Sequence, residues 1–433
     1  MKELLDFIAR SPSPYHAAEN VCETLSRAGF ERLYEHDEWR IGRGGCYYAV
    51  RGGSSVIAFS VPECEYAGLA VCASHTDSPS FKIKSTPEIP EVNGLVRLNI
   101  EGYGGMAKES WFDRPLSVAG RAVVGAEDGI EYRTVDIDRD LLVIPSLAVH
   151  MGKPREGDKV NIQTELLPIL RGAQSPNSFL ELAAEAAGIE PGELLGFDLY
   201  LYNREKGTVF GADKEFIASP RIDNLESVYL SLEAFIASEK TSDKTSMLKV
   251  FAAFNNEETG SLSRQGTEST FFSDVMERVN ESLGVSGAEY KRRLASSFIM
   301  SADNAHAAHP NYISKADPEI RPRLNGGVVI KHNASARYTT DAVSAAVVKK
   351  LCASAGVPYQ DYHNRSDIAG GSTLGNLMNR YISVHSADIG LAQLAMHSAY
   401  ETAGAKDPEY MKALLLRFYG SEFCASENGL CIK

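Results

Sequence analysis

Imidazole and carboxylate side chains follow three apolar stretches of this sequence within a few residues. They are His75 and Asp77 after residues 69–73, Glu257 and Glu258 after 247–254, and Asp303 after 297–301. Asp223 and His397 lie beside predicted helices and can join them. Imidazole nitrogens and carboxylate oxygens suit Zn²⁺ and other borderline divalent ions, and this set is larger than one tetrahedral ion requires. A carboxylate shared by two ions is the most economical arrangement.

Taken singly, each of these residues has a more ordinary explanation. A His-x-Asp pair is commonly a surface pair or a capped turn, and adjacent glutamates commonly belong to a solvated helix face. Asp303 can be a helix N-cap, and His397 can be a hydrogen-bonded core histidine. These explanations fit less well for polar residues that directly follow a buried strand. The residues after 69–73, 247–254 and 297–301 are in this position.

The apolar stretches are short and compact, which is typical of strands buried on both faces of a sheet. We expect strands at 56–60, 69–73, 247–254, 297–301, 328–331 and 382–385. Helical patterns, among them those opening at Ser13 and at Leu225, alternate with these strands, which predicts an α/β fold with a mostly parallel sheet flanked by helices. Because ligands bind beyond the carboxyl ends of strands in such sheets, we expect the polar side chains to converge on one crevice.

The segment from 86 to 215 has a different pattern. Short strand-like pieces at 102–105, 116–120 and 132–137 are divided by turns, and one helix is predicted from Ser178. We therefore expect a domain formed by 1–85 and 216–433, interrupted by an inserted β-rich domain at 86–215.

Composition limits the classes of function. The 433 residues are 44% hydrophobic and 23% charged, as in a folded globular protein, and the net charge of −13 disfavours binding to nucleic acid or to an anionic membrane. No apolar run approaches the roughly 18 residues of a membrane span, and Glu3 and Asp6 interrupt the position of a signal-peptide core. Seven cysteines without a CxxC pair favour reduced thiols. We expect a soluble, cytoplasmic protein.

The order of six motifs resembles that of the M18 metallopeptidases, the aspartyl aminopeptidases. The motifs are His-Thr-Asp-Ser-Pro at 75–79, Trp-Phe-Asp-Arg-Pro at 111–115, Asp-Asn at 223–224, Asn-Glu-Glu-Thr-Gly-Ser at 256–261, Asp-Asn-Ala-His-Ala-Ala-His-Pro-Asn-Tyr at 303–312, and Gln-Leu-Ala-Met-His-Ser at 393–398. The resemblance extends from near residue 13 to near residue 419. It implies a two-metal aminopeptidase whose β-rich insert serves oligomerisation.

The resemblance also assigns metal ligands. His75, Asp223 and Asp303 would hold one divalent ion, whereas Asp223, Glu258 and His397 would hold the other, so that Asp223 bridges the two. Zn²⁺ is the expected ion at both sites, with Mn²⁺ or Co²⁺ as alternatives.

Two further residues receive catalytic roles. The Asp77 side chain would hydrogen-bond the far nitrogen of His75 and fix its orientation. Glu257 would be the general base that acts on a metal-bridging water. Because consecutive side chains of an extended chain point to opposite sides, we expect Glu258 to bind the metal while Glu257 faces the water.

The implied substrates are peptides with N-terminal Asp or Glu. The acidic chain would repel such side chains, so we expect a local cation, and Lys331 at the end of 328–330 is the candidate, with Tyr338 and His306 beside it. The resemblance further implies a homo-oligomer, a dodecamer built from dimers, in which His150 reaches the active site of a neighbouring subunit.

Two other functions stay open at this point. One is a two-metal aminopeptidase of neutral or broad specificity, and the other is a non-catalytic peptide-binding shell. The second is disfavoured because all five expected ligands, together with Asp77 and Glu257, are present. The sequence departs from the family pattern at Ile368-Ala369 and at 385–390, which concerns the substrate subsites and not the metals.

Overall fold

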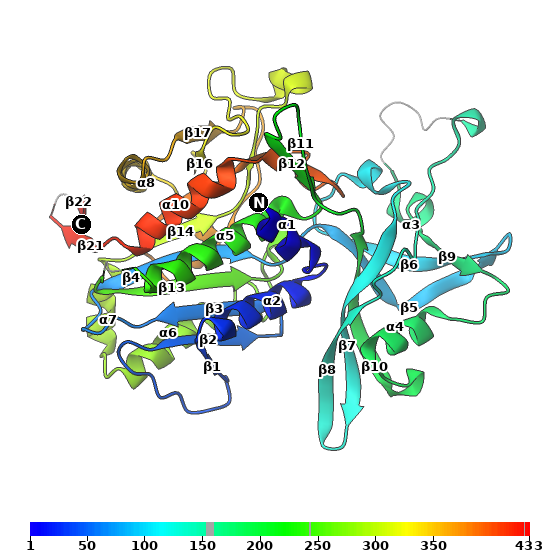
Figure 1. Cartoon of the computed structure of the whole chain (residues 1–433), viewed down its shortest axis with the longest axis horizontal. Coiled ribbons are helices and arrows are strands. Elements are labelled where there is room, and N and C mark those ends of the chain that lie inside the picture. The colour runs from blue at the N-terminus through cyan, green and yellow to red at the C-terminus, as the bar shows by residue number, and fades with distance from the viewer. Residues whose placement is uncertain (153–159, 242–243, 428) are drawn as a thin grey trace.

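The computed structural model describes residues 1–152, 160–241, 244–427 and 429–433 (Figure 1). In this part of the chain the largest sheet has nine strands. In spatial order they are β1 (Glu31–Leu33), β2 (Cys46–Arg51), β3 (Ser55–Ser60), β13 (Met247–Phe254), β4 (Gly68–His75), β14 (Phe298–Ala302), β18 (His385–Gly390), β16 (Val328–His332) and β17 (Tyr359–His363).

The centre of this sheet is parallel. Strands β13, β4, β14 and β18 all run in one direction, whereas β2–β3, β3–β13 and β16–β18 are antiparallel pairs. The predicted α/β class with a mostly parallel sheet is confirmed, and the antiparallel pairs lie on either side of the four central strands. All residues of β4 and β13 are buried, as expected of strands covered on both faces.

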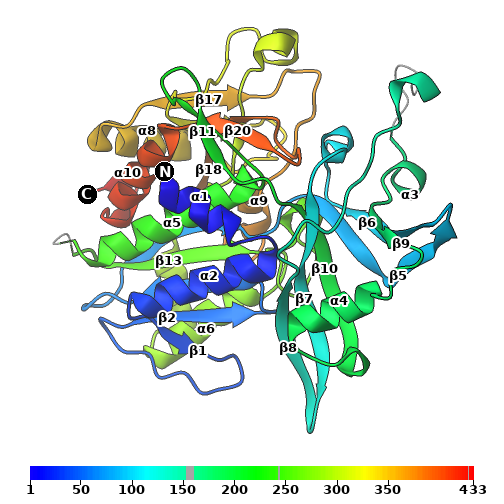
Figure 2. The same ribbon diagram turned by 45° about the vertical axis from the view of Figure 1, so that its right-hand side comes forward.

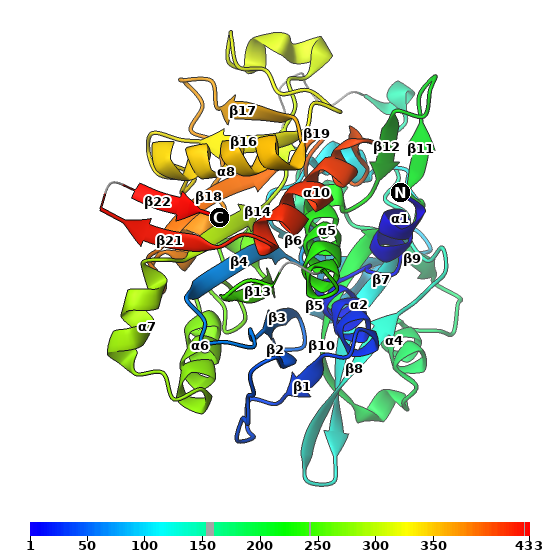
Figure 3. The same cartoon turned by 60° about the vertical axis from the view of Figure 1, so that its left-hand side comes forward.

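Helices cover both faces of the sheet (Figure 3). One face packs against α1 (Lys2–Ala9), α2 (Pro14–Arg27), α5 (Ile222–Glu239), α8 (Ala342–Ala355) and α10 (Asp407–Tyr419). The other packs against α6 (Phe271–Ser282), α7 (Gly287–Leu294) and α9 (Leu374–Met378). Side chains of β13 alternate between the two cores, with Phe251 in the first and Val250 in the second. Ser13 caps α2, as its sequence predicts.

A second, six-stranded antiparallel sheet lies beside the first (Figure 2). Its strands in spatial order are β8 (Gly129–Asp136), β7 (Leu116–Ala126), β10 (Leu194–Asn203), β5 (Ser80–Val92), β6 (Leu95–Tyr103) and β9 (Ile169–Gly172). Helix α4 (Phe179–Ala187) packs on this sheet and begins with a capping box at Ser178, close to the predicted start; α3 (Ile162–Glu165) is a single turn. The boundary expected after residue 85 falls inside β5.

A third sheet connects the segments that surround the candidate site. Its strands in spatial order are β11 (Thr208–Phe210), β12 (Phe216–Ser219), β20 (Glu401–Gly404), β19 (Ala392–Leu394) and β15 (Ala305–His306). A terminal hairpin is formed by β21 (Phe423–Ser426) and β22 (Gly429–Ile432). Among the described residues, no helix combines the length and the apolar content needed to cross a membrane.

One predicted strand is misplaced. Residues 382–384 lie between α9 and the strand, in neither element, and β18 begins only at His385. The true strand contains Ser386 and Asp388, which are buried because they are hydrogen-bonded; Asp388 accepts from the hydroxyls of Thr339 and Thr373. Because these buried residues are polar, β18 lacks the continuous apolar run by which a buried strand is predicted from the sequence.

Candidate metal centre and active site

The carboxyl ends of the parallel central strands carry most of the candidate ligands. His75 is the last residue of β4, Asp303 follows β14, and Glu258 lies in the turn after β13. Because these strands are parallel neighbours, their ends lie at one edge of the sheet. Asp223 stands at the start of α5 in a non-helical conformation, and His397 lies in the turn between β19 and β20.

These side chains form two groups that share Asp223. Its Oδ1 lies 3.6 Å from His75 Nε2, which is also 3.6 Å from Asp303 Oδ1. Its Oδ2 lies 3.4 Å from His397 Nε2, which is also 3.4 Å from Glu258 Oε1. Each group offers three ligand atoms within 4.8 Å of one another, and the two oxygens of one carboxylate face different imidazoles.

This geometry fits divalent metal ions. Ligand atoms about 2.1 Å from a tetrahedral ion are about 3.4 Å apart, close to the spacings seen here. Asp223 Oδ1 and Glu258 Oε1 are buried and have no hydrogen-bond partner among the described residues. Buried carboxylate oxygens without donors are costly unless a cation binds them, so the donor set suits metal binding.

The pKa values of the candidate ligands also indicate that the site lacks positive charge. Burial, together with the Asp303 and Asp77 charges, raises the pKa of Glu257 to about 8, and burial raises the pKa of Glu258 well above its ordinary value. Burial opposes protonation of His397, but Asp223 and Glu258 outweigh it and raise the pKa to about 10. Crowded carboxylates of this kind are stabilised by a bound cation.

The two glutamates do not point to opposite sides, as an extended chain would predict. Residues Glu257–Thr259 form a 3₁₀ turn, and both carboxylates approach His75. The turn follows Asn256, which lies two residues after the end of β13 and has a φ of +64°, so the chain is no longer extended where the glutamates begin. Both glutamates therefore lie beside His75, and Glu258 alone also belongs to the group with Asp223 and His397.

The contacts of Asp77 differ in one respect from the sequence-based expectation. His75 Nδ1 lies 3.0 Å from the main-chain oxygen of Asp77 but 3.5 Å from its carboxylate. The carboxylate instead accepts hydrogen bonds from the main-chain N–H groups of Glu257 at 3.2 Å and Glu258 at 3.1 Å. Asp77 thus supports the imidazole mainly through its carbonyl and the glutamate turn through its side chain.

Tyr103 is a participant that the sequence does not reveal. Its hydroxyl donates to Asp77 Oδ2 at 2.8 Å and accepts from Asn256 Nδ2 at 2.9 Å. Tyr103 ends β6, so the second sheet directly supports the turn that carries the glutamates. In the sequence Tyr103 belongs to the short strand-like piece at 102–105, and nothing local points to Asp77.

The predicted substrate residues line the same cavity as the ligands. This cavity measures about 300 Å³, and Lys331, Tyr338 and His306 all contribute to its wall. Lys331 is buried, and its Nζ lies 3.2 Å from Asp303 Oδ2 and 5.4 Å from the centre of the Tyr338 ring. The ammonium group is therefore aimed at the metal-binding groups, where it helps to hold the pKa of Asp303 below its usual range against the effect of burial.

His150 stands apart from this cavity. It lies in the 3₁₀ turn Val149–Met151, it is exposed, and it is not among the residues that line the cavity. Leu147, Val149 and Met151 beside it are also exposed. The structure describes one chain, so the role of His150 across a subunit interface stays a prediction.

An α/β sheet that carries two imidazole–carboxylate groups and a further half-buried glutamate at one edge is typical of a metal-dependent hydrolase. Residues 7–419 match the family model described as aminopeptidase I zinc metalloprotease (M18). The chain belongs to this M18 family of metalloaminopeptidases, as the six sequence motifs predict.

Individual relatives agree over nearly the whole chain. A probable M18 family aminopeptidase 2 of Clostridium acetobutylicum is 41% identical over 427 residues, which cover 96% of this chain and 98% of the relative. The structure of the Ape4 and Nbr1 complex contains a similar chain with a TM-score of 0.93 and 36% identity, covering 97% of this chain and 85% of that one. The S. cerevisiae mApe1 dodecamer gives a TM-score of 0.85 and 26% identity, with coverage of 96% and 95%.

Proposed function

We propose that this aminopeptidase binds two metal ions, with zinc as the expected metal, and removes N-terminal Asp and Glu residues from peptides. The observation that carries the acidic specificity is the buried Lys331 ammonium inside the metal-site cavity. The division of the ligands into two groups around Asp223 supports the pair of ions. A buried cation beside the reacting centre favours an anionic side chain, because a neutral one leaves without a partner the ammonium donors that Asp303 does not take.

In the proposed hydrolysis, the metal ions, Glu257 and the residues that hold Glu257 in place have different roles. Bound metal ions would supply a water nucleophile of lowered pKa and polarise the scissile carbonyl. Glu257 accepts the proton of the attacking water and passes it to the leaving amine. Asp77 and Tyr103 hold the Glu257 turn at the required position.

Lys331 serves the substrate and the metal site together. An ammonium group has three donors, and Asp303 takes one of them, which leaves donors for the substrate carboxylate. Tyr338 and His306 line the same wall and add polar groups to this subsite. Replacing Lys331 therefore affects Asp303 as well as specificity, and a test must separate the two effects.

We predict that Lys331→Met lowers kcat/KM for Asp- and Glu-amides relative to Leu- and Ala-amides by about 10²-fold, or roughly 3 kcal/mol. The ratio between substrates is the decisive quantity, because a weakened Asp303 lowers turnover of all of them equally. The assay uses amino-acid amides with chelated enzyme resupplied with Zn²⁺, Mn²⁺ or Co²⁺. Lys350→Met, an exposed lysine on α8 outside the cavity, is the control.

Two results would contradict the acidic specificity. One is a wild-type enzyme that prefers neutral residues, which favours the broad-specificity aminopeptidase. The other is an unchanged ratio in Lys331→Met, which places the acidic subsite elsewhere in the cavity.

We further propose a homo-oligomer, a dodecamer built from dimers, in which His150 completes the active site of a neighbouring subunit. The similarity to the mApe1 dodecamer supports the assembly. The exposed apolar side chains of Leu147, Val149 and Met151 beside His150 support burial of this segment in a contact between copies.

Complementation tests the role of His150. A subunit carrying His150→Ala keeps its own Glu257, and a neighbour carrying Glu257→Gln can supply the missing histidine. Each variant alone should be nearly inactive, whereas random co-assembly of equal amounts should restore about one quarter of wild-type activity. Sedimentation and activity are measured on the co-expressed mixture. A fully active monomer, or a mixture no better than its components, would refute the shared site.

A further inference from the structure

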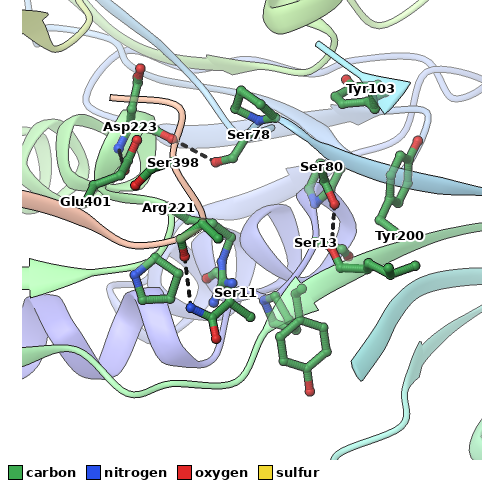
Figure 4. A pocket seen from close by; sticks show the side chains of 18 of the residues that line it. Ser11, Ser13, Ser78, Ser80, Tyr103, Tyr200, Arg221, Asp223, Ser398 and Glu401 are labelled. Carbon is green, nitrogen blue, oxygen red and sulfur yellow. Dashed lines mark hydrogen bonds between the residues drawn. The ribbon is translucent and has the colours of Figure 1, made fainter. Parts of the chain in front are cut away.

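Glu401 is a buried carboxylate that none of the roles above uses. It is the first residue of β20, it pairs in register with Ser219 of β12, and the residue is only 2% exposed. Figure 4 shows it beside Asp223, with Arg221 below them, and all three residues line a second cavity.

The two oxygens of Glu401 bind two different ligand-bearing segments. Oε2 accepts from the main-chain N–H of Asp223 at 3.0 Å, and Oε1 accepts from the main-chain N–H of His397 at 2.7 Å. Gln393 Nε2 also donates to Oε1, at 3.3 Å. One rigid carboxylate therefore joins the backbones of two residues whose side chains approach each other at 3.4 Å in the same metal-binding group.

Both segments need such external support. Asp223 interrupts the start of α5 with φ −80° and ψ 109°, so no helical hydrogen bond holds its N–H. His397 has a φ of +66°, which is uncommon for a residue other than glycine. The loop after β6 holds the other side of the His397 turn, because the Ala107 N–H donates to the His397 carbonyl at 3.0 Å.

We propose that Glu401 is a positioning residue that sets the separation of Asp223 and His397 and thereby the affinity of the metal site they form with Glu258. The proposal rests on the two-metal function above. A group that hydrogen-bonds a metal ligand from behind typically changes metal affinity 10–100-fold, and a carboxylate also adds negative charge behind the ion. Glu401 acts here on two ligands of one ion through their backbone.

Glu401→Gln is the direct test. The amide has nearly the same size, but its nitrogen is a donor and cannot accept a main-chain N–H, so one ligand segment loses its partner. We expect the affinity of one of the two zinc sites to fall about 10–100-fold. At limiting Zn²⁺, elemental analysis should show bound zinc decreasing from two ions per chain toward one. The visible spectrum of the Co²⁺ form should change in parallel, and kcat should fall more than KM changes.

Asp407 provides a matched control. It is a buried carboxylate at the start of α10, and its oxygens accept from the main-chain N–H groups of Asn325 at 2.6 Å and Gly327 at 2.9 Å. Neither Asn325 nor Gly327 belongs to a metal-binding group. We expect both Asp407→Asn and Glu401→Gln to lower the melting temperature, because each removes an acceptor from a buried main-chain N–H. Asp407→Asn should nevertheless keep wild-type zinc affinity at both sites.

The outcomes separate this inference from the function on which it rests. Wild-type enzyme with one zinc ion per chain would overturn the two-metal function. Two sites of wild-type affinity in Glu401→Gln, or equal zinc loss in Asp407→Asn, would overturn the role of Glu401 alone. If Glu401→Gln does not fold, Glu401→Asp serves the same purpose, because the shorter side chain keeps the charge but cannot reach both amides.

Discussion

Glu257→Gln is expected to keep the fold and both metal ions and to lower kcat by about 10²–10⁴-fold. Glutamine has nearly the same shape but cannot accept a proton from the attacking water. In the proposed assignment Glu257 is not a metal ligand, so zinc content should stay at the wild-type value. The Glu257 N–H that donates to Asp77 belongs to the main chain, so the turn should also survive. Zinc stoichiometry and kcat must be measured on the same preparation.

A second buried glutamate provides the control for this variant. Glu226 of α5 is fully buried, and burial raises its pKa to about 8, as for Glu257. It does not line the metal-site cavity, and its Oε2 accepts only from Asn304 at 3.3 Å in the described residues. Glu226→Gln should change stability with little effect on kcat. Near-normal turnover in fully metallated Glu257→Gln would remove Glu257 as the base.

The features that could be predicted from the sequence are those with a local physical signature. Strand β13 is a continuous apolar run, because both of its faces are buried, and the polar residues after it mark the strand end. Helix α4 carries its own start signal in the Ser178 capping box. The candidate ligands His75, Glu258 and Asp303 follow from the same logic, because polar side chains at the ends of buried parallel strands face the crevice, whereas Asp223 and His397 are assigned from the family resemblance.

The missed features depend on contacts between distant segments. Tyr103 and Glu401 both support the site from other sheets, and their partners lie far away in the sequence. Strand β18 was misplaced because Asp388 is polar and yet buried, which requires hydrogen bonds that only the folded chain supplies. The 3₁₀ turn at Glu257 likewise depends on the Asp77 carboxylate that accepts its N–H groups.

Asp223→Asn should remove metal from both groups at once, because its two oxygens face two different imidazoles. Asparagine keeps one oxygen but loses the charge, and its nitrogen cannot be a ligand for a second ion. Replacing a residue that only supports a metal ligand typically lowers metal affinity 10–100-fold. Replacing a ligand that both ions share should therefore lower the affinity of both sites by more than about 10²-fold. Glu258→Ala and His397→Ala should instead each empty mainly one site.

The competing explanation is that Asp223 only caps α5, which would make its loss cost about 1 kcal/mol of stability and leave the metals in place. The structure disfavours it: in the described part of the chain no main-chain N–H donates to the Asp223 carboxylate, whose Oδ1 is buried without a hydrogen-bond partner. Elemental analysis and thermal unfolding of the three variants decide between the two. Two ions bound to Asp223→Asn with wild-type affinity would contradict the shared carboxylate, and so would a loss confined to one ion. Loss of both ions with a folded chain is the result that only a bridging ligand explains.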